Sequence, residues 1–121
     1  MAGKVLIVDD EFSGRQTLES VLETDDYELE MAENGKDAIE KAKAFLPDVI
    51  LLDLMMPVMS GHEAFGHFRK IRKDIPVVII SGYSTDRSLQ EVLESDRVQF
   101  LRKPFEMVEL NDALKMILQN G

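Results

Sequence analysis

The middle of the chain reads Val49-Ile50-Leu51-Leu52-Asp53-Leu54-Met55-Met56-Pro57, an apolar run that meets a carboxylate and is closed by a proline turn. Continuous hydrophobicity with β-branched residues at the start is typical of a strand covered on both faces, as in a parallel α/β sheet. Asp53 then lies at the carboxyl end of this strand, where open α/β sheets bind their ligands. A charged group at that position is better explained by a role in ligand chemistry than by a role in stabilising the fold.

The rest of the chain alternates strand and helix patterns on either side of this stretch. Strands are expected at residues 5–8, 27–32, 48–53, 76–80 and 98–101, the second of them nearer the sheet edge. Apolar residues at helical spacing predict helices over about 12–24, 36–46, 62–72, 84–94 and 105–118. Asn34-Gly35 is expected to form a turn, and the last helix is expected to bury Val108, Leu114, Ile117 and Leu118. Five strands alternating with five helices predict one doubly wound α/β domain over residues 1–121.

The composition narrows the functional classes. With 14 basic against 23 acidic residues and a net charge of −9, the chain is not expected to bind nucleic acid directly, because that affinity comes mostly from basic groups. The absence of cysteine excludes disulfides and thiolate chemistry and fits a reducing compartment. No signal-peptide core and no apolar run of about 18 residues is present. We therefore expect a soluble cytoplasmic protein with protein partners and no membrane contact.

Four apolar runs end in a reactive or charged group: Asp9-Asp10, Asp53, Ser81 and Lys103. The carboxyl ends of parallel strands share one rim, and a 2-1-3-4-5 strand order would place Asp10 beside Asp53. Crowded carboxylates resist ionisation unless a cation intervenes, and oxygen ligands favour Mg²⁺. Lys103 adds a positive charge and Ser81 a hydroxyl donor. The pattern predicts a phosphoryl pocket in which the Asp53 carboxylate can attack phosphorus.

These features together closely resemble the receiver domain of two-component response regulators. The resemblance covers essentially the whole chain and is carried by Asp9-Asp10, by Asp53 with Met56-Pro57 and Gly61, by Ser81-Gly82, and by Lys103-Pro104-Phe105. It implies a flavodoxin-like five-stranded parallel sheet in the order 2-1-3-4-5 with five helices. It also implies a signalling domain that catalyses only its own phosphorylation and dephosphorylation.

The resemblance assigns a role to each site residue. Asp53 would take the phosphoryl group from a phosphohistidine on a sensor kinase. Mg²⁺ would be bound by Asp10, Asp53 and the backbone carbonyl of Met55, with Asp9 helping through water. Lys103 would pair with the phosphoryl oxygens.

Switching is the second implication of the resemblance. Ser81 would move towards the phosphate and Phe100 would turn inward, and this movement would remodel a protein-binding face. The resemblance also implies that the Lys103–Pro104 bond is cis. The implied partners are a histidine kinase or histidine phosphotransfer protein and an unnamed downstream protein, with the domain a monomer or a phosphorylation-dependent dimer. Two positions depart from the common pattern: Asp96-Arg97 replaces a small pair before the fifth strand, and Phe100 replaces tyrosine.

Several alternatives share parts of this pattern. A haloacid-dehalogenase-type phosphatase needs an acid two residues after the nucleophile, where this chain has Met55, and a flavodoxin-like electron carrier needs a hydroxyl- and glycine-rich first loop, which residues 9–13 do not form. A phosphorylation-independent scaffold would be expected to lack Asp53, an acidic partner or Lys103, and all of these are present. A receiver excised from a hybrid histidine kinase or a longer response regulator stays open. His62 and His67 are expected to be solvated rather than metal ligands.

Overall fold

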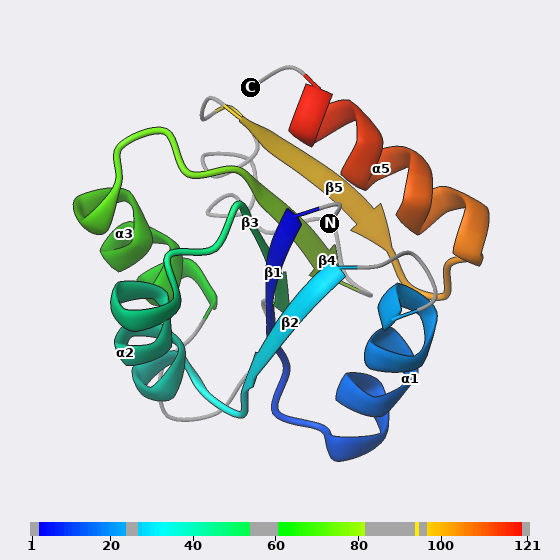
Figure 1. Ribbon diagram of the computed structural model, residues 1–121, viewed down its shortest axis with the longest axis horizontal. Coiled ribbons are helices and arrows are strands. Elements are labelled where there is room, and N and C mark those ends of the chain that lie inside the picture. The colour runs from blue at the N-terminus through cyan, green and yellow to red at the C-terminus, as the bar shows by residue number, and fades with distance from the viewer. Residues whose placement is uncertain (1–2, 24–26, 54–60, 82–93, 95–96, 120–121) are drawn as a thin grey trace.

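The computed structural model describes residues 3–23, 27–53, 61–81, 94 and 97–119, and these form a central parallel sheet flanked by helices (Figure 1). The strand order is β2-β1-β3-β4-β5, as predicted. The strands are β1 (Gly3–Val8), β2 (Tyr27–Ala32), β3 (Val49–Asp53), β4 (Val77–Ser81) and β5 (Val98–Arg102). The described helices are α1 (Phe12–Glu23), α2 (Gly35–Phe45), α3 (Gly61–Ile71) and α5 (Met107–Gln119). The helix expected over 84–94 falls almost entirely outside the described residues.

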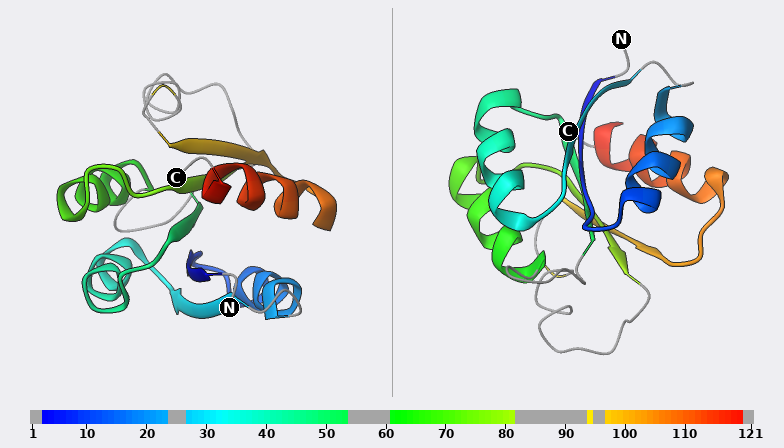
Figure 2. Two further views of the ribbon diagram at one scale, coloured as in Figure 1. Left: turned by 45° about the horizontal axis from the view of Figure 1, so that its top comes forward. Right: turned by 90° about the horizontal axis from the view of Figure 1, so that it is seen from below.

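The helices cover the two faces of the sheet, α1 and α5 on one and α2 and α3 on the other (Figures 1 and 2). Successive side chains of β1 alternate between the two layers: Val5 and Ile7 belong to the core under α1 and α5, whereas Leu6 and Val8 belong to the core under α2 and α3. All four are at most 1% exposed. This explains why the inner strands are continuously hydrophobic, since a strand with both faces covered has no polar side.

Helix α2 is fixed at both ends by its capping residues. Asn34 is the N-cap, and its Oδ1 accepts a hydrogen bond of 2.8 Å from the backbone N–H of Asp37. Leu46 follows the helix in the left-handed conformation, with φ 51°, and donates its N–H to the Ala42 carbonyl. The helix therefore begins at Gly35, one residue before its expected start at Lys36, because asparagine satisfies a free amide of the first turn.

Helix α5 differs from its predicted register. The helix begins at Met107, and Glu109 Oε1 accepts a hydrogen bond of 3.0 Å from the Glu106 backbone N–H, which fixes the first turn. Burial of Val108 was a wrong prediction, since that side chain is 64% exposed. The residues that face the sheet are Leu110, Ala113, Leu114 and Ile117. At 3.6 residues per turn, Val108 lies about 200° around the helix from Leu110 and so faces solvent.

The turn before β5 carries one of the departures noted in the sequence. Arg97 adopts a left-handed conformation, with φ 62°. Its carbonyl accepts a hydrogen bond of 3.0 Å from Val77 N–H, and its guanidinium donates one of 3.2 Å to the Ile117 carbonyl. Arg97 thus links this turn to β4 and to the end of α5, whereas Asp96 lies outside the described residues.

Two further observations complete the architecture. Strand β2 lies at the sheet edge, as predicted, and only its last residue, Ala32, is fully buried. Within the described ranges, the helices are too short and too polar for any of them to span a bilayer.

Candidate functional site

Two adjacent strands bring the acidic residues to one place. Val8 is level with Leu52 in the β1–β3 pairing, so the next residues, Asp9 and Asp53, stand side by side at the carboxyl rim. Asp10 follows directly. Carboxylate oxygens of Asp9, Asp10 and Asp53 all lie within 4.8 Å of one another. The structure therefore assembles the three acids that the sequence analysis singled out.

Asp9 is held from several sides. Its side chain is 5% exposed, and its Oδ1 accepts a hydrogen bond of 2.9 Å from the Glu11 backbone N–H. Its own N–H donates to the Ala32 carbonyl at 3.1 Å, and its carbonyl accepts a bond of 2.7 Å from the Arg15 guanidinium. Strand β2 and the first turn of α1 thus fix where this carboxylate points.

Lys103 supplies the positive charge of the site. It follows β5, and its Nζ lies 3.3 Å from Asp53 Oδ2 and 4.0 Å from Asp9 Oδ2. Asp53 is nearly as enclosed as Asp9, with a side chain 8% exposed. Lys103 contacts two carboxylates on neighbouring strands, so one ammonium group is shared between them.

The electrostatic balance at Asp9 favours a cation. Burial raises the pKa of the Asp9 carboxyl above its ordinary value, and the nearby Asp53 carboxylate raises it further. The Glu11 N–H and the Lys103 ammonium oppose this rise. Lys103 contacts two of the three clustered carboxylates. A divalent cation would relieve the remaining repulsion.

The donor set fits Mg²⁺ rather than a softer metal. All three side chains offer carboxylate oxygens, and Asp10 is the partly exposed member of the set. Mg²⁺ prefers oxygen ligands, uses one or two carboxylates, and retains waters that phosphate oxygens can replace. Asp10 therefore provides an open side on which such exchange could occur.

The structure describes some of the remaining predicted site residues fully and others only in part or not at all. Ser81 ends β4 and is paired with Arg102 of β5, but its side chain and the whole of Met55 lie outside the described residues. Phe100 in β5 is half-buried and packs against the core under α2 and α3. The Lys103–Pro104 peptide bond is cis, as the resemblance implied.

A hollow of about 470 Å³ opens beside the acids, and the sequence analysis did not anticipate it. It is lined by Asp9, Gly14, Thr17, Leu18, Ile80, Lys103, Pro104 and Phe105. Gly14 and Thr17 come from α1, and neither carries a chemical group that a motif search would notice. A glycine inside a helical pattern was the one available signal, because such a glycine often has a packing reason.

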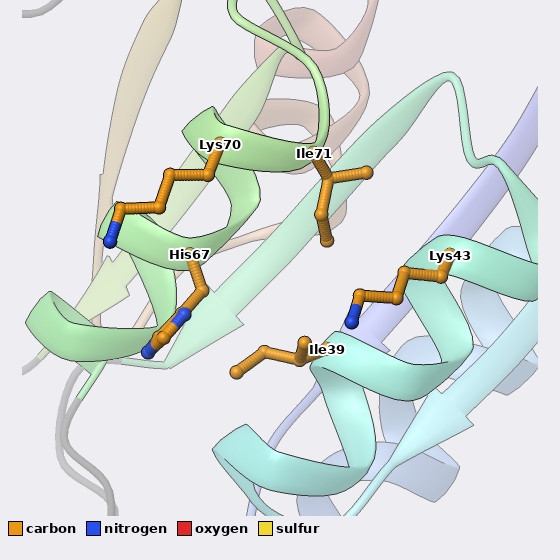
Figure 3. Close-up of a pocket in the computed structure, with 5 residues that line it drawn as sticks. All are labelled: Ile39, Lys43, His67, Lys70 and Ile71. Carbon is orange, nitrogen blue, oxygen red and sulfur yellow. The ribbon is translucent and has the colours of Figure 1, made fainter.

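A second hollow, of about 450 Å³, lies between α2 and α3 (Figure 3). Ile39 and Ile71 form its apolar part, and Lys43, Lys70 and His67 complete its lining. His67 is exposed, and two lysines beside it oppose the binding of a cation. This hollow has no acidic lining residue, so it is chemically distinct from the acidic site.

Comparison with known proteins places the chain in a family. The family model described as the response regulator receiver domain matches residues 5–115. Sporulation initiation phosphotransferase F of Bacillus subtilis is 34% identical over 118 residues, covering 98% of this chain and 95% of that protein. The regulatory protein AtoC of Escherichia coli is 32% identical over 96% of this chain, but the matched region is only 25% of AtoC. Relatives of this chain thus include proteins of its own length and much longer ones.

A solved structure agrees with this assignment. The response regulator TrrA of Thermotoga maritima, in complex with Mg²⁺ and BeF, is 35% identical and superposes with a TM-score of 0.85 over 95% of this chain and 98% of that one. The chain belongs to the response regulator receiver family of two-component signal transduction.

Proposed function

We propose that Asp53 is the phosphoacceptor of this receiver domain. The observation that carries the proposal is the shared ammonium group of Lys103, 3.3 Å from Asp53 at a rim where three carboxylates converge. In the transfer step, a carboxylate oxygen of Asp53 forms a bond to phosphorus. The P–N bond of a phosphohistidine on the donor breaks, and the imidazole nitrogen keeps the electron pair and takes up a proton.

Mg²⁺ is the cofactor that the site would hold. Asp10 and Asp53 would bind it directly with the backbone carbonyl of Met55, and Asp9 would act through a bound water. When bound, Mg²⁺ neutralises charge that develops on the phosphoryl oxygens. The acids hold this cation beside the nucleophile, and the buried side chain of Asp9 limits the solvent on that side.

Phosphorylation of Asp53 would rearrange three side chains, those of Lys103, Ser81 and Phe100. Lys103 exchanges its contact with Asp53 for one with a phosphoryl oxygen, because the new group carries more negative charge at nearly the same place. Ser81 donates its hydroxyl to another of these oxygens. Phe100 then turns further inward, and because it lacks a hydroxyl this movement depends on packing alone.

The partners follow from the same chemistry. The donor is a histidine kinase or a histidine phosphotransfer protein, and a downstream protein binds the altered face. The name of the Bacillus subtilis relative, a phosphotransferase, suggests that the group could also be passed on. The domain acts as a monomer or as a phosphorylation-dependent dimer, and its catalysis is confined to gain and loss of its own phosphoryl group.

Intact-protein mass spectrometry after incubation with acetyl phosphate tests this function. We expect a gain of one phosphoryl group that requires Mg²⁺ and is lost in Asp53→Asn. Asp48→Asn is a matched control: Asp48 precedes the other end of β3, is exposed, and accepts a hydrogen bond from Lys4 N–H that asparagine can also accept. Labelling of Asp53→Asn at the wild-type rate would refute the assignment. If wild type is not labelled, transfer from a phosphorylated kinase becomes the deciding assay.

A further inference from the structure

Gly14 lies in the first turn of α1, directly against the carboxylate of Asp9. Glycine is disfavoured inside helices, so its presence there calls for a reason. An ideal Cβ at position 14 would lie less than 3.0 Å from Asp9 Oδ2, closer than real Cβ atoms approach other heavy atoms, and at a tight 3.1 Å from Asp9 Cγ. The Asp9 carboxylate occupies the space that any other side chain at position 14 would need.

Two contacts hold the Asp9 carboxylate in this space. Its Oδ1 is engaged by the Glu11 N–H, and its Oδ2 faces Lys103 Nζ at 4.0 Å. The atoms that a Cβ at position 14 would meet belong to the Asp9 side chain and not to the backbone. The conflict would therefore be relieved by rotation of the carboxylate, which leaves the helix in place and changes the acidic site.

Gly66 provides an internal comparison. It lies in the middle of α3 and is exposed, and an ideal Cβ there meets nothing within 4 Å. Both glycines are helical, but only Gly14 adjoins a functional side chain. The close approach at Gly14 is thus specific to the acidic site.

We propose that Gly14 is a positioning residue for the metal site. Its missing side chain leaves room for Asp9 to hold its carboxylate among those of Asp10 and Asp53, where the three favour a divalent cation. This inference rests on the proposed binding of Mg²⁺ and adds a residue that has no ligand atom of its own.

Isothermal titration calorimetry with Mg²⁺ tests the inference on wild type, Gly14→Ala and Gly66→Ala. We expect Gly14→Ala to raise the Kd for Mg²⁺ about tenfold, the lower end of the effect of losing a residue that orients ligands. Gly66→Ala should bind Mg²⁺ as wild type does. Gly66→Ala should unfold at or above the wild-type urea midpoint, because alanine restricts the unfolded chain more than glycine does and its Cβ meets nothing there. Gly14→Ala should remain folded.

A double-mutant cycle shows whether Gly14 acts through Asp9. In an Asp9→Ala background, where no carboxylate adjoins position 14, adding Gly14→Ala should leave the weakened Mg²⁺ affinity unchanged. An undiminished loss in that background would overturn the inference, and so would equal affinities of wild type and Gly14→Ala. An unfolded Gly14→Ala protein would overturn it too, since the conflict would then fall on the backbone.

These outcomes separate the inference from the proposed function. If wild type binds Mg²⁺ and Gly14→Ala binds it equally well, the inference about Gly14 fails and the metal site stands. If wild type does not bind Mg²⁺, the proposed metal site fails and the positioning role fails with it.

Discussion

Replacing Asp9 by asparagine is expected to stabilise the metal-free protein at neutral pH. The Asp9 side chain is 5% exposed, and burial and the Asp53 carboxylate raise the pKa of its carboxyl. Ionisation of Asp9 thus costs more free energy in the folded chain than in the unfolded chain. Asparagine removes this charge but can still accept the hydrogen bond from Glu11 N–H.

The size and sign of the effect follow from proton linkage. Below the ordinary carboxyl pKa, 3.8, Asp9 is protonated in both states and adds no pH dependence. Above that value the folded state binds the proton more tightly, so the free energy of unfolding falls as pH rises until Asp9 is ionised in both states. Each unit of pKa difference corresponds to about 1.4 kcal/mol. We expect Asp9→Asn to gain about 0.5–2 kcal/mol at pH 7, as single stabilising substitutions do.

Urea denaturation at pH 7, with a chelator and with Mg²⁺, measures this prediction. The exposed Asp112 of α5 provides the control Asp112→Asn, which changes the net charge equally at a residue outside the acidic cluster. Mg²⁺ at a hundred times its Kd should stabilise wild type by about 2.7 kcal/mol and should stabilise Asp9→Asn less. A metal-free Asp9→Asn protein less stable than wild type would refute the reasoning, as would an equal gain in Asp112→Asn.

Two further predictions concern Lys103 and α5. Lys103→Met should bind Mg²⁺ at least as tightly as wild type in calorimetry, because a competing positive charge 3.3 Å from Asp53 is removed. Labelling of the same variant by acetyl phosphate should be slower. Loss of both Mg²⁺ affinity and labelling would contradict the assigned role. In α5, Leu110→Ala should lower the free energy of unfolding by about 2–5 kcal/mol in urea denaturation, whereas Val108→Ala should change it by less than about 0.5 kcal/mol. Similar losses in these two variants would contradict the register of the helix.

Much of this architecture was predictable because its signals are local. Continuous apolar runs marked the inner strands, and helical spacing marked the helices, since each pattern reflects how one element is covered. The strand order and the cis bond before Pro104 were expectations from family resemblance. Asp9, Asp53 and Lys103 were predictable as a cluster because each lies at, or directly after, the carboxyl end of a strand of a parallel sheet.

The parts that sequence reasoning missed depend on contacts between elements. The register of α5 was misjudged at Val108 because several apolar residues compete for the inner face, and the bond from Glu106 N–H to Glu109 decides where the helix starts. Gly14 was overlooked because it acts through the absence of a side chain. That absence matters only because the Asp9 carboxylate lies where a Cβ at position 14 would be, and the sequence does not show this contact.

The alternation of side chains along the inner strands has a consequence for how this domain can diverge. Neighbouring residues such as Leu51 and Leu52 belong to different cores, the first under α1 and α5 and the second under α2 and α3. Substitutions in one layer can therefore accumulate and reshape one outer surface while the opposite layer keeps its packing. Residues just beyond the strand ends belong to neither layer. A binding surface for a new partner could thus form on one helix layer while the acidic site at the carboxyl ends of the strands stays unchanged.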